Sequence, residues 1–334
     1  MVSPGRADPH NLSTKVGERC DPLAGEGKRM RHKTLAAAAA VGLGLLTACS
    51  SISSSTATAP ASSGNTSTAP ATSSAQATSS ASAASCSNAS IQSQLYAKGV
   101  LTVATDTPAY PPWFIGNKPA NGQGYESAVA FAVAKQLGFT PSQVNWVTEP
   151  FDSSYAPGPK KFDFDINEIS VTPERSTAVT FSDSYYDVQQ ALVALKGSPI
   201  TTKHDPASLK TYVYGDQIGT TSLAFINSQI RPTSTPRVYN DLNAVKQALD
   251  TKQIAALVAD TPTAQYISSQ QIPNSVMVGQ FPSTGEHFGL LFAKGNPLVT
   301  CVNQALATLK ANGTLTSLQR KYLKDYLSVP TIKP

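Results

Sequence analysis

One short stretch of the chain alternates apolar and polar side chains. In order, its residues are Phe162, Asp163, Phe164, Asp165, Ile166 and Asn167. This period of two predicts a strand with one buried face. The strand leads into Ser170, Thr172 and Arg175, and a guanidinium just beyond two hydroxyls at a strand's C-terminal end suits bidentate binding of a small carboxylate. A plain surface arginine after a proline-containing turn fits these residues equally well.

The segments around this stretch predict alternating strands and helices. They are strands over 100–104, 144–147 and 178–181 and a helix over 127–137. Prolines break the chain after the first strand into a loop that displays Asp106, Tyr110 and Trp113, and Phe151 begins the loop after the second. This alternation predicts an α/β fold in which strand ends line a crevice.

The front of the chain predicts export. Residues 28–49 carry a positive cluster followed by an apolar run from Leu35 to Leu46, which is too short for a permanent membrane span. The ending at Cys49 resembles the lipobox of bacterial lipoproteins, in which this cysteine is lipidated; a cleaved secretory peptide with a coincidental cysteine is the alternative. We therefore expect a signal peptide over 30–48, with residues 1–29 an upstream extension of the true start at Met30.

Composition supports an extracytoplasmic location. Residues 49–87 form a segment rich in Ser, Thr and Ala that cannot bury enough apolar surface to order itself, so we expect a flexible tether to a lipid-anchored protein. Much of the net charge of +5 comes from the leader, so a nucleic-acid partner gains no support.

The four cysteines divide between the front of the chain and the folded part. Cys20 lies in the leader and Cys49 is the lipidation candidate, which leaves Cys86 and Cys301. In an oxidising compartment, a disulfide between these two is favoured over two free thiols.

Several motifs in fixed order resemble the polar-amino-acid-binding extracellular solute-binding proteins of ABC importers. They are LTVATDTPAYPPW, GQGYESAVAFAVAKQLGF, FDFDINEISVTPERSTAVTFSDSYY, IGTTS, AALVADTPTAQYI and FGLLFAKGNPLV. The resemblance implies a two-lobed, periplasmic-binding-protein-like α/β fold with an interlobe ligand cleft and two hinge strands, near 189–195 and 287–292. Lobe 1 would comprise 88–190 and 291–334, and lobe 2 would comprise 191–290.

The same resemblance implies roles for single residues around an amino acid. Arg175 would grip its carboxylate together with Ser170, while Thr172 either contributes or only caps the turn. Tyr110 and Phe151 would sandwich its side chain, with core packing as the alternative for either ring, although the proline-rich loop around Tyr110 suits a core poorly.

On the other lobe, Thr220 and Thr221 precede a predicted helix whose exposed N–H groups favour the same carboxylate, although plain N-capping is the alternative. Asp260 would pair with the ligand ammonium, with N-capping again as the alternative, and the backbone carbonyl of Glu168 would also receive the ammonium.

Two departures from the family pattern bear on the ligand. Prolines and glycine in 153–161 forbid the short helix that relatives carry after the Phe-Asp pair, and Tyr155 is a candidate to enter the rebuilt pocket. Glu168 replaces a small residue. With Asp106 and Glu149, it favours a ligand with a donor-rich side chain such as glutamine, arginine or histidine.

We therefore expect a monomeric binding protein, without metal or cofactor, that delivers an amino acid to an ABC permease. One alternative is a sensor that reports its ligand to a membrane signalling protein. The other is a dehydratase-type enzyme on the same fold, which the absence of HExxH, GxSxG and CxxC motifs disfavours.

Overall fold

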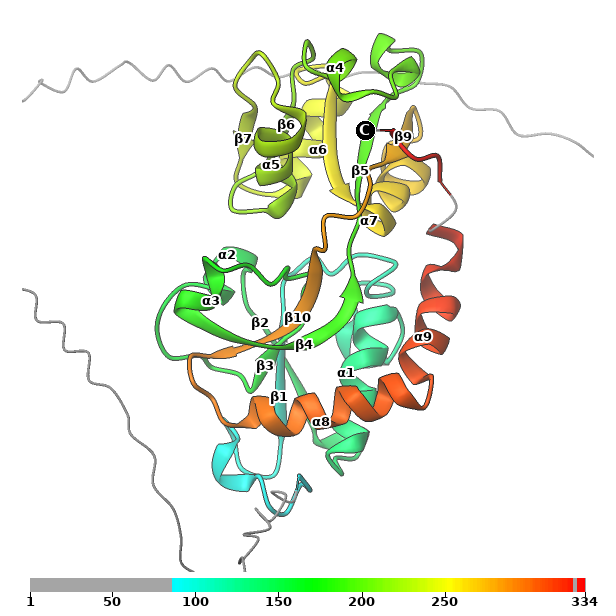
Figure 1. The fold of residues 1–334 in the computed structure, drawn as a ribbon. Coiled ribbons are helices and arrows are strands. Elements are labelled where there is room, and N and C mark those ends of the chain that lie inside the picture. Colours follow the sequence, from blue (N-terminus) through cyan, green and yellow to red (C-terminus); the bar gives the residue numbers. More distant parts are fainter. Residues whose placement is uncertain (1–85, 327–328, 334) are drawn as a thin grey trace, which may run out of the picture. The chain divides into compact units, whose positions relative to one another are not determined.

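The computed structural model describes residues 86–326 and 329–333 (Figure 1). The predicted start at Met30, signal peptide, lipidated Cys49 and most of the tether lie outside these residues. Within the described ranges, no helix is both long enough and apolar enough to cross a bilayer.

Lobe 1 is built on a five-stranded sheet in the order β2-β1-β3-β10-β4. Its strands are β1 (Leu101–Thr105), β2 (Val144–Thr148), β3 (Phe164–Asp165), β4 (Val179–Asp187) and β10 (His287–Ala293). β1 pairs in parallel with both its neighbours, whereas β10 is antiparallel to β3 and β4. The parallel strands therefore end at one edge of the sheet, where the loops carrying Asp106, Phe151 and Glu168 begin.

Helices cover both faces of this sheet. One face packs against α1 (Tyr125–Gln136), α8 (Leu298–Ala311) and α9 (Thr314–Leu323), and the other lies under α2 (Phe151–Ser154) and α3 (Arg175–Ala178). Because both faces are covered, polar residues on the central strand have no access to water.

The prediction that this strand has one buried and one exposed face is therefore wrong. β3 contains only Phe164–Asp165, it lies between β1 and β10, and both Asp163 and Asp165 are 0% exposed. Asp163 is satisfied by the backbone N–H groups of Tyr96 and Thr102, each at 2.6 Å. The strand predicted over 178–181 is also longer than expected, because the residues that follow it, up to Asp187, pair with β10 as well.

Lobe 2 contains a three-stranded sheet and a two-stranded sheet. The first has the order β8-β5-β9, formed by β5 (Gln190–Leu195), β8 (Ala256–Asp260) and β9 (Ser275–Gln280). The second pairs β6 (Gly215–Gln217) with β7 (Arg237–Tyr239), and a bridge between Tyr214 and Ala256 joins the two sheets.

The helices of lobe 2 also lie on both sides of its sheet. They are α4 (Pro206–Leu209), α5 (Thr221–Phe225), α6 (Leu242–Asp250) and α7 (Thr261–Tyr266). α6 and α7 share one apolar core, and α4 and α5 share the other. α5 and α7 each continue into a π-helical turn, over Ile226–Ile230 and Ile267–Gln271.

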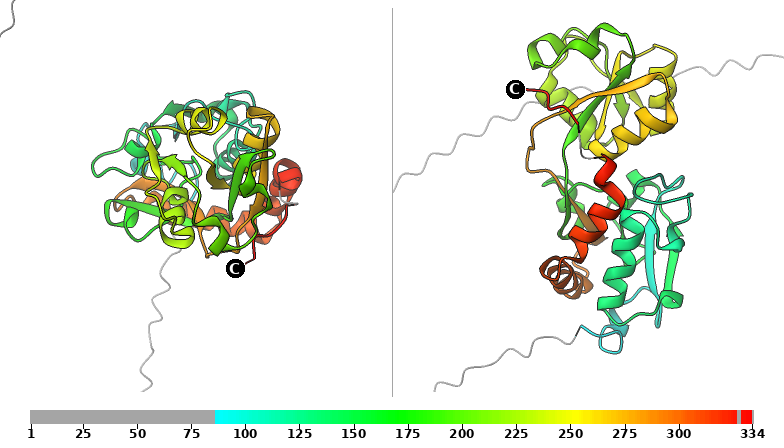
Figure 2. Two further views of the ribbon diagram at one scale, coloured as in Figure 1. Left: turned by 90° about the horizontal axis from the view of Figure 1, so that it is seen from above. Right: turned by 90° about the vertical axis from the view of Figure 1, so that its right-hand side faces the viewer.

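The chain changes lobes between β4 and β5 and again between β9 and β10, and the right-hand view of Figure 2 shows these two crossings side by side in green and orange. The apolar runs expected as hinge strands are mostly sheet strands, with β5 in lobe 2 and β10 in lobe 1. The crossings are the short segments just before each run.

The C-terminal end departs from the expected assignment of 291–334 to lobe 1. Gln280 of β9 donates to the Pro330 carbonyl at 2.8 Å and accepts from the Ile332 N–H at 2.7 Å, and Ile332 is 1% exposed within lobe 2. Gly279 makes this possible, because a Cβ there would lie 2.9 Å from the Pro330 oxygen. The end of the chain thus extends the edge of β9.

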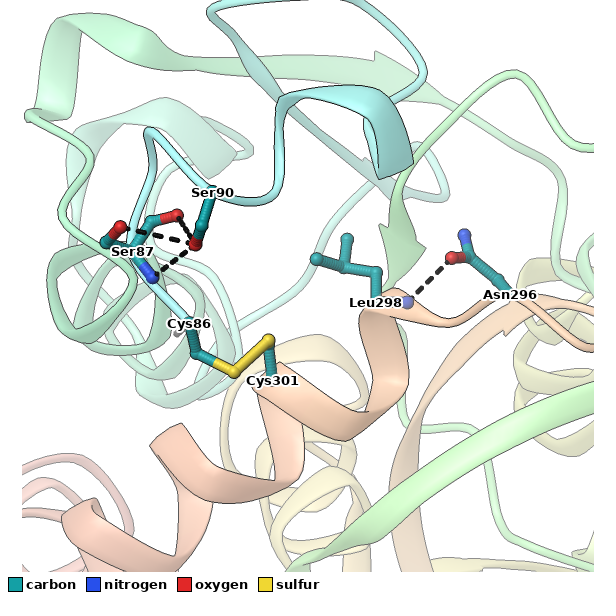
Figure 3. Close-up of a disulfide and its surroundings, with 6 residues drawn as sticks. All are labelled: Cys86, Ser87, Ser90, Asn296, Leu298 and Cys301. Carbon is teal, nitrogen blue, oxygen red and sulfur yellow. Dashed lines mark hydrogen bonds between the residues drawn. A yellow bond between two sulfur atoms is a disulfide. The ribbon is translucent and has the colours of Figure 1, made fainter. Parts of the chain in front are cut away.

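The predicted disulfide is confirmed. Cys86 and Cys301 are bonded across a sequence separation of 215 residues, with their Cα atoms 5.2 Å apart (Figure 3). Cys301 lies on α8, so the bond ties the beginning of the described chain to lobe 1.

Candidate functional site

A cavity of about 470 Å³ lies between the two lobes. Its lining includes seven of the residues singled out from the sequence: Asp106, Tyr110, Phe151, Glu168, Thr220, Thr221 and Asp260. The loops that follow β1, β2 and β3 supply the lobe 1 wall, and residues in or just after β6, β7 and β8 supply the lobe 2 wall. Fold topology thus brings together side chains from distant parts of the sequence.

Asp106 fixes the geometry of the lobe 1 wall. Its carboxylate accepts hydrogen bonds from the backbone N–H of Thr107 at 2.6 Å and of Phe151 at 3.2 Å. These bonds join the loops after β1 and β2. Each carboxylate oxygen retains lone pairs, so Asp106 can still accept from a donor in the cavity.

Tyr110 reaches across to lobe 2. Its hydroxyl donates to Asn243 Oδ1 at 2.6 Å, and Lys246 Nζ lies 4.4 Å from the centre of its ring. Both contacts come from α6. They hold the ring in the cavity wall, where an aromatic face can cover a ligand's side chain.

Arg175 lies outside the lining of the cavity. It is 7% exposed, with one terminal nitrogen donating to the Ser170 carbonyl at 2.8 Å and the other to the Gly219 carbonyl of lobe 2 at 2.9 Å. Its guanidinium also lies 5.3 Å from the Phe151 ring centre and 4.6 Å from that of Tyr155. Since a guanidinium has five N–H groups, these two bonds leave others for an anion.

Ser170 and Thr172 also lie outside the lining among the described residues. Thr172 Oγ1 accepts from the Arg175 backbone N–H at 3.1 Å, which is the turn-capping role left open by the sequence. The Ser170 hydroxyl donates to Glu286 at 2.6 Å and lies 3.3 Å from the Thr221 hydroxyl of lobe 2.

The two threonines of lobe 2 divide their roles. Thr220 is the N-cap of α5, and its hydroxyl accepts from the Leu223 N–H at 3.1 Å. Thr221 is the first residue of the helix and faces Ser170. Plain N-capping therefore accounts for Thr220, while Thr221 remains a candidate ligand contact.

Asp260 occupies the N-cap position of α7, yet its side chain makes no capping hydrogen bond within the described chain. It instead accepts from Gln190 Nε2 at 2.8 Å, and the same nitrogen donates to Glu286 at 3.0 Å. Ser222 donates to Gln190 Oε1 at 2.8 Å, which fixes the orientation of the amide. Burial, followed by the charge of Glu286, raises the pKa of Asp260 well above its usual range.

Sequence reasoning missed Gln190 and Glu286. Gln190 follows the first crossing and Glu286 precedes β10 at the second, so their bonds link the two hinges to the site. The only signal in the sequence was a polar residue at the start of each apolar run.

The cavity is strongly acidic. Carboxylates from both lobes line it, namely Asp106, Asp152, Glu168, Asp216, Asp241 and Asp260, and no Lys, Arg or His is found among the described lining residues. Burial raises the pKa of Glu168 well above its usual range, and the charges of Glu126 and Asp260 add to this effect. Burial likewise raises the pKa of Asp216 to about 7. No group of acidic, histidine or cysteine residues in the described chain forms a metal site.

The segment over 153–161 differs in part from expectation. A one-turn helix, α2, does form over Phe151–Ser154, because it ends before the first proline of the segment. Tyr155 lies edge-on to Phe151, with ring centres 5.5 Å apart, and it stacks on Arg175 rather than lining the cavity.

Residues 101–325 match the family model of the bacterial extracellular solute-binding proteins, family 3. The chain belongs to this family. Its fold is accordingly the two-lobed periplasmic-binding-protein-like fold, as the sequence resemblance implied.

Named relatives bind amino acids. The L-arginine-binding protein of Pseudomonas aeruginosa is 25% identical over 238 residues, covering 66% of this chain and 90% of that protein. The probable histidine-binding protein of Campylobacter jejuni is 28% identical over 249 residues, covering 71% and 91%. Among solved structures, an ancestral arginine-binding protein bound to glutamine has a TM-score of 0.58 at 29% identity, covering 67% of this chain and 98% of that one.

These findings establish the class. The protein is an extracytoplasmic, amino-acid-binding solute-binding protein of the ABC-importer type, and it is a binding protein rather than an enzyme.

Proposed function

We propose that the protein binds an amino acid whose side chain is cationic or rich in N–H donors, and that it delivers this amino acid to an ABC permease. The observation that carries the proposal is the cavity wall, which presents six carboxylates and, among the described lining residues, no basic side chain. In a partly dehydrated cavity, like charges repel strongly unless a cation lies between them. Relatives named for arginine and histidine agree with this preference.

The zwitterionic part of the ligand has partners of opposite charge. Asp260, held by Gln190, would receive the ammonium, together with the backbone carbonyl of Glu168. The remaining N–H groups of Arg175 and the start of α5 at Thr221 would receive the carboxylate. Because Arg175 and Thr221 come from different lobes, a bound carboxylate would hold the lobes together.

A thermal-shift screen of the purified protein against the twenty amino acids, followed by calorimetry, tests the ligand class. We expect arginine, lysine, histidine or glutamine to give the largest stabilisation, since a ligand that binds only the folded state raises its stability. Binding of aspartate or glutamate with none of these four would contradict the proposal.

Delivery and anchoring need separate tests. Deletion of the gene should reduce uptake of the identified amino acid; unchanged uptake with altered signalling would favour the sensor role instead. We also propose lipidation at Cys49, so Cys49→Ser should release the protein from the membrane fraction.

A further inference from the structure

Three side chains form a continuous hydrogen-bond chain that crosses between the lobes beside the cavity. Trp113 Nε1 of lobe 1 donates to Thr263 Oγ1 on α7 of lobe 2 at 2.7 Å, and Thr263 Oγ1 donates to Glu168 Oε2 of lobe 1 at 2.7 Å. Because an indole N–H is only a donor, the threonine hydroxyl accepts from Trp113, and its own proton is then available for the ionised Glu168 carboxylate.

Lobe 1 holds Trp113 and Glu168, the two ends of this series of hydrogen bonds, rigidly. Trp113 is 0% exposed and meets the rings of Tyr186 and Phe288 edge-on, with ring centres 5.3 and 5.6 Å apart. Gly124 lets the backbone pass against Trp113, since a Cβ there would overlap with the Trp113 carbonyl. The Trp113 indole is thus presented at a fixed place.

Glu168 is fixed in a similar way. Its backbone N–H donates to Glu126 Oε1 at 2.7 Å, and its φ of 53° places it in the left-handed region. Glu126 is itself fully buried. A backbone conformation of this kind costs energy unless the surroundings hold it, and here it turns the Glu168 side chain toward lobe 2.

We propose that Trp113, Thr263 and Glu168 form an interlobe clasp that positions the Glu168 carboxylate next to Asp260 and so selects amino acids with a cationic side chain. This inference rests on the proposed function. Thr263 lies between two lobe 1 side chains, so the clasp can form only when the lobes close. It therefore favours the closed form by an amount that adds to ligand affinity.

The selectivity follows from counting charges at this end of the cavity. Glu168 and Asp260 both line the cavity, and the charge of Asp260 is close enough to contribute to the raised pKa of Glu168. A single α-ammonium neutralises only one of them. An amino acid that brings a second positive charge neutralises both, whereas an acidic amino acid adds a third negative charge.

Two variants separate the clasp from the charge. Thr263→Val keeps the shape of the side chain but removes both hydrogen bonds, with Thr263→Ser as the matched control that keeps the hydroxyl. Glu168→Gln keeps an acceptor for Thr263 but removes the charge. With L-arginine and L-glutamine as the probes in calorimetry, we expect Thr263→Val to weaken binding of both about tenfold. Glu168→Gln should weaken the binding of arginine about tenfold and leave the binding of glutamine nearly unchanged.

A readout without ligand keeps the clasp testable on its own. The chain has two tryptophans, so Trp146→Phe leaves Trp113 as the single fluorophore. Adding Thr263→Val should shift its emission, and adding Thr263→Ser should not. If the parent protein binds no amino acid, the proposed function fails while the emission still tests the clasp. Equal affinities and emission for the valine and serine variants would overturn the clasp, and equal weakening of both ligands by Glu168→Gln would overturn the charge selection.

Discussion

Replacing Asp165 by valine should stabilise the fold. Asp165 is 0% exposed on the central strand β3, and neither of its carboxylate oxygens has a hydrogen-bond partner in the described chain. A buried polar group left unsatisfied costs about 1–3 kcal/mol. Valine also suits a strand better than aspartate, on a scale that spans about 1 kcal/mol. Allowing for an imperfect fit, we expect a gain of about 2 kcal/mol in the free energy of unfolding at pH 7.

The gain should depend on pH. Burial raises the pKa of Asp165 well above its usual range, with the charges of Glu126, Glu149 and Asp106 adding to the effect and Lys160 opposing it. The unfolded carboxyl ionises near pH ~4, while the folded one keeps its proton to higher pH. Unfolding therefore releases a proton in this window, so the wild type loses stability relative to the variant as the pH rises from ~4 toward the folded pKa.

Urea unfolding between pH 4 and pH 8, with calorimetry for the melting temperature, measures both effects. A gain of about 2 kcal/mol corresponds to roughly 4–8 °C for a domain of this size. Asp163→Val is the matched control. Asp163 is equally buried but accepts two backbone N–H groups, so its loss should destabilise the protein. The reasoning is refuted if Asp165→Val destabilises the fold as much as Asp163→Val does.

Three further predictions concern the site and the chain ends. Arg175→Ala should abolish ligand binding in calorimetry and Arg175→Lys should restore it only in part, since an ammonium cannot grip a carboxylate bidentately; normal binding by the alanine variant would remove Arg175 from the site. Cys301→Ser should lower the stability of the oxidised protein by up to about 5 kcal/mol, given the 215-residue separation, and no change in the urea midpoint would speak against a bond in solution. Ile332→Asp should release the C-terminal segment, which hydrogen exchange would detect as lost protection at Gln280, while protection in lobe 1 stays unchanged.

The motifs could be recognised in the sequence because each depends only on residues close together in the chain. Strand and helix periods, the loops at strand ends and the helix start at Thr220 all depend on neighbours in sequence. These sufficed to predict an α/β fold whose strand ends line a crevice. The two lobes and most of the residue roles followed from the resemblance to the solute-binding proteins, and seven of the ten candidate site residues line the cavity. The disulfide followed from the export signal, because an oxidising compartment favours pairing of the two remaining cysteines.

The burial of β3 could not be read from its alternation. The same pattern fits a strand at the edge of a sheet and a strand in its centre, and only the pairing with both β1 and β10 shows that Asp163 and Asp165 lie in the core. The position of Ile332 in lobe 2 depended likewise on Gly279, which lies far from it in the sequence.

The sequence by itself determined the chemistry available to the site: an arginine for an anion, carboxylates for cations and aromatic rings for a side chain. Only the tertiary structure decided how these groups are used. It placed Arg175 outside the lining of the cavity, joined Asp260 to Glu286 through Gln190, and set Thr263 between Trp113 and Glu168. These contacts join residues far apart in the chain, and their partners are fixed by the packing of two lobes, which local sequence patterns do not encode.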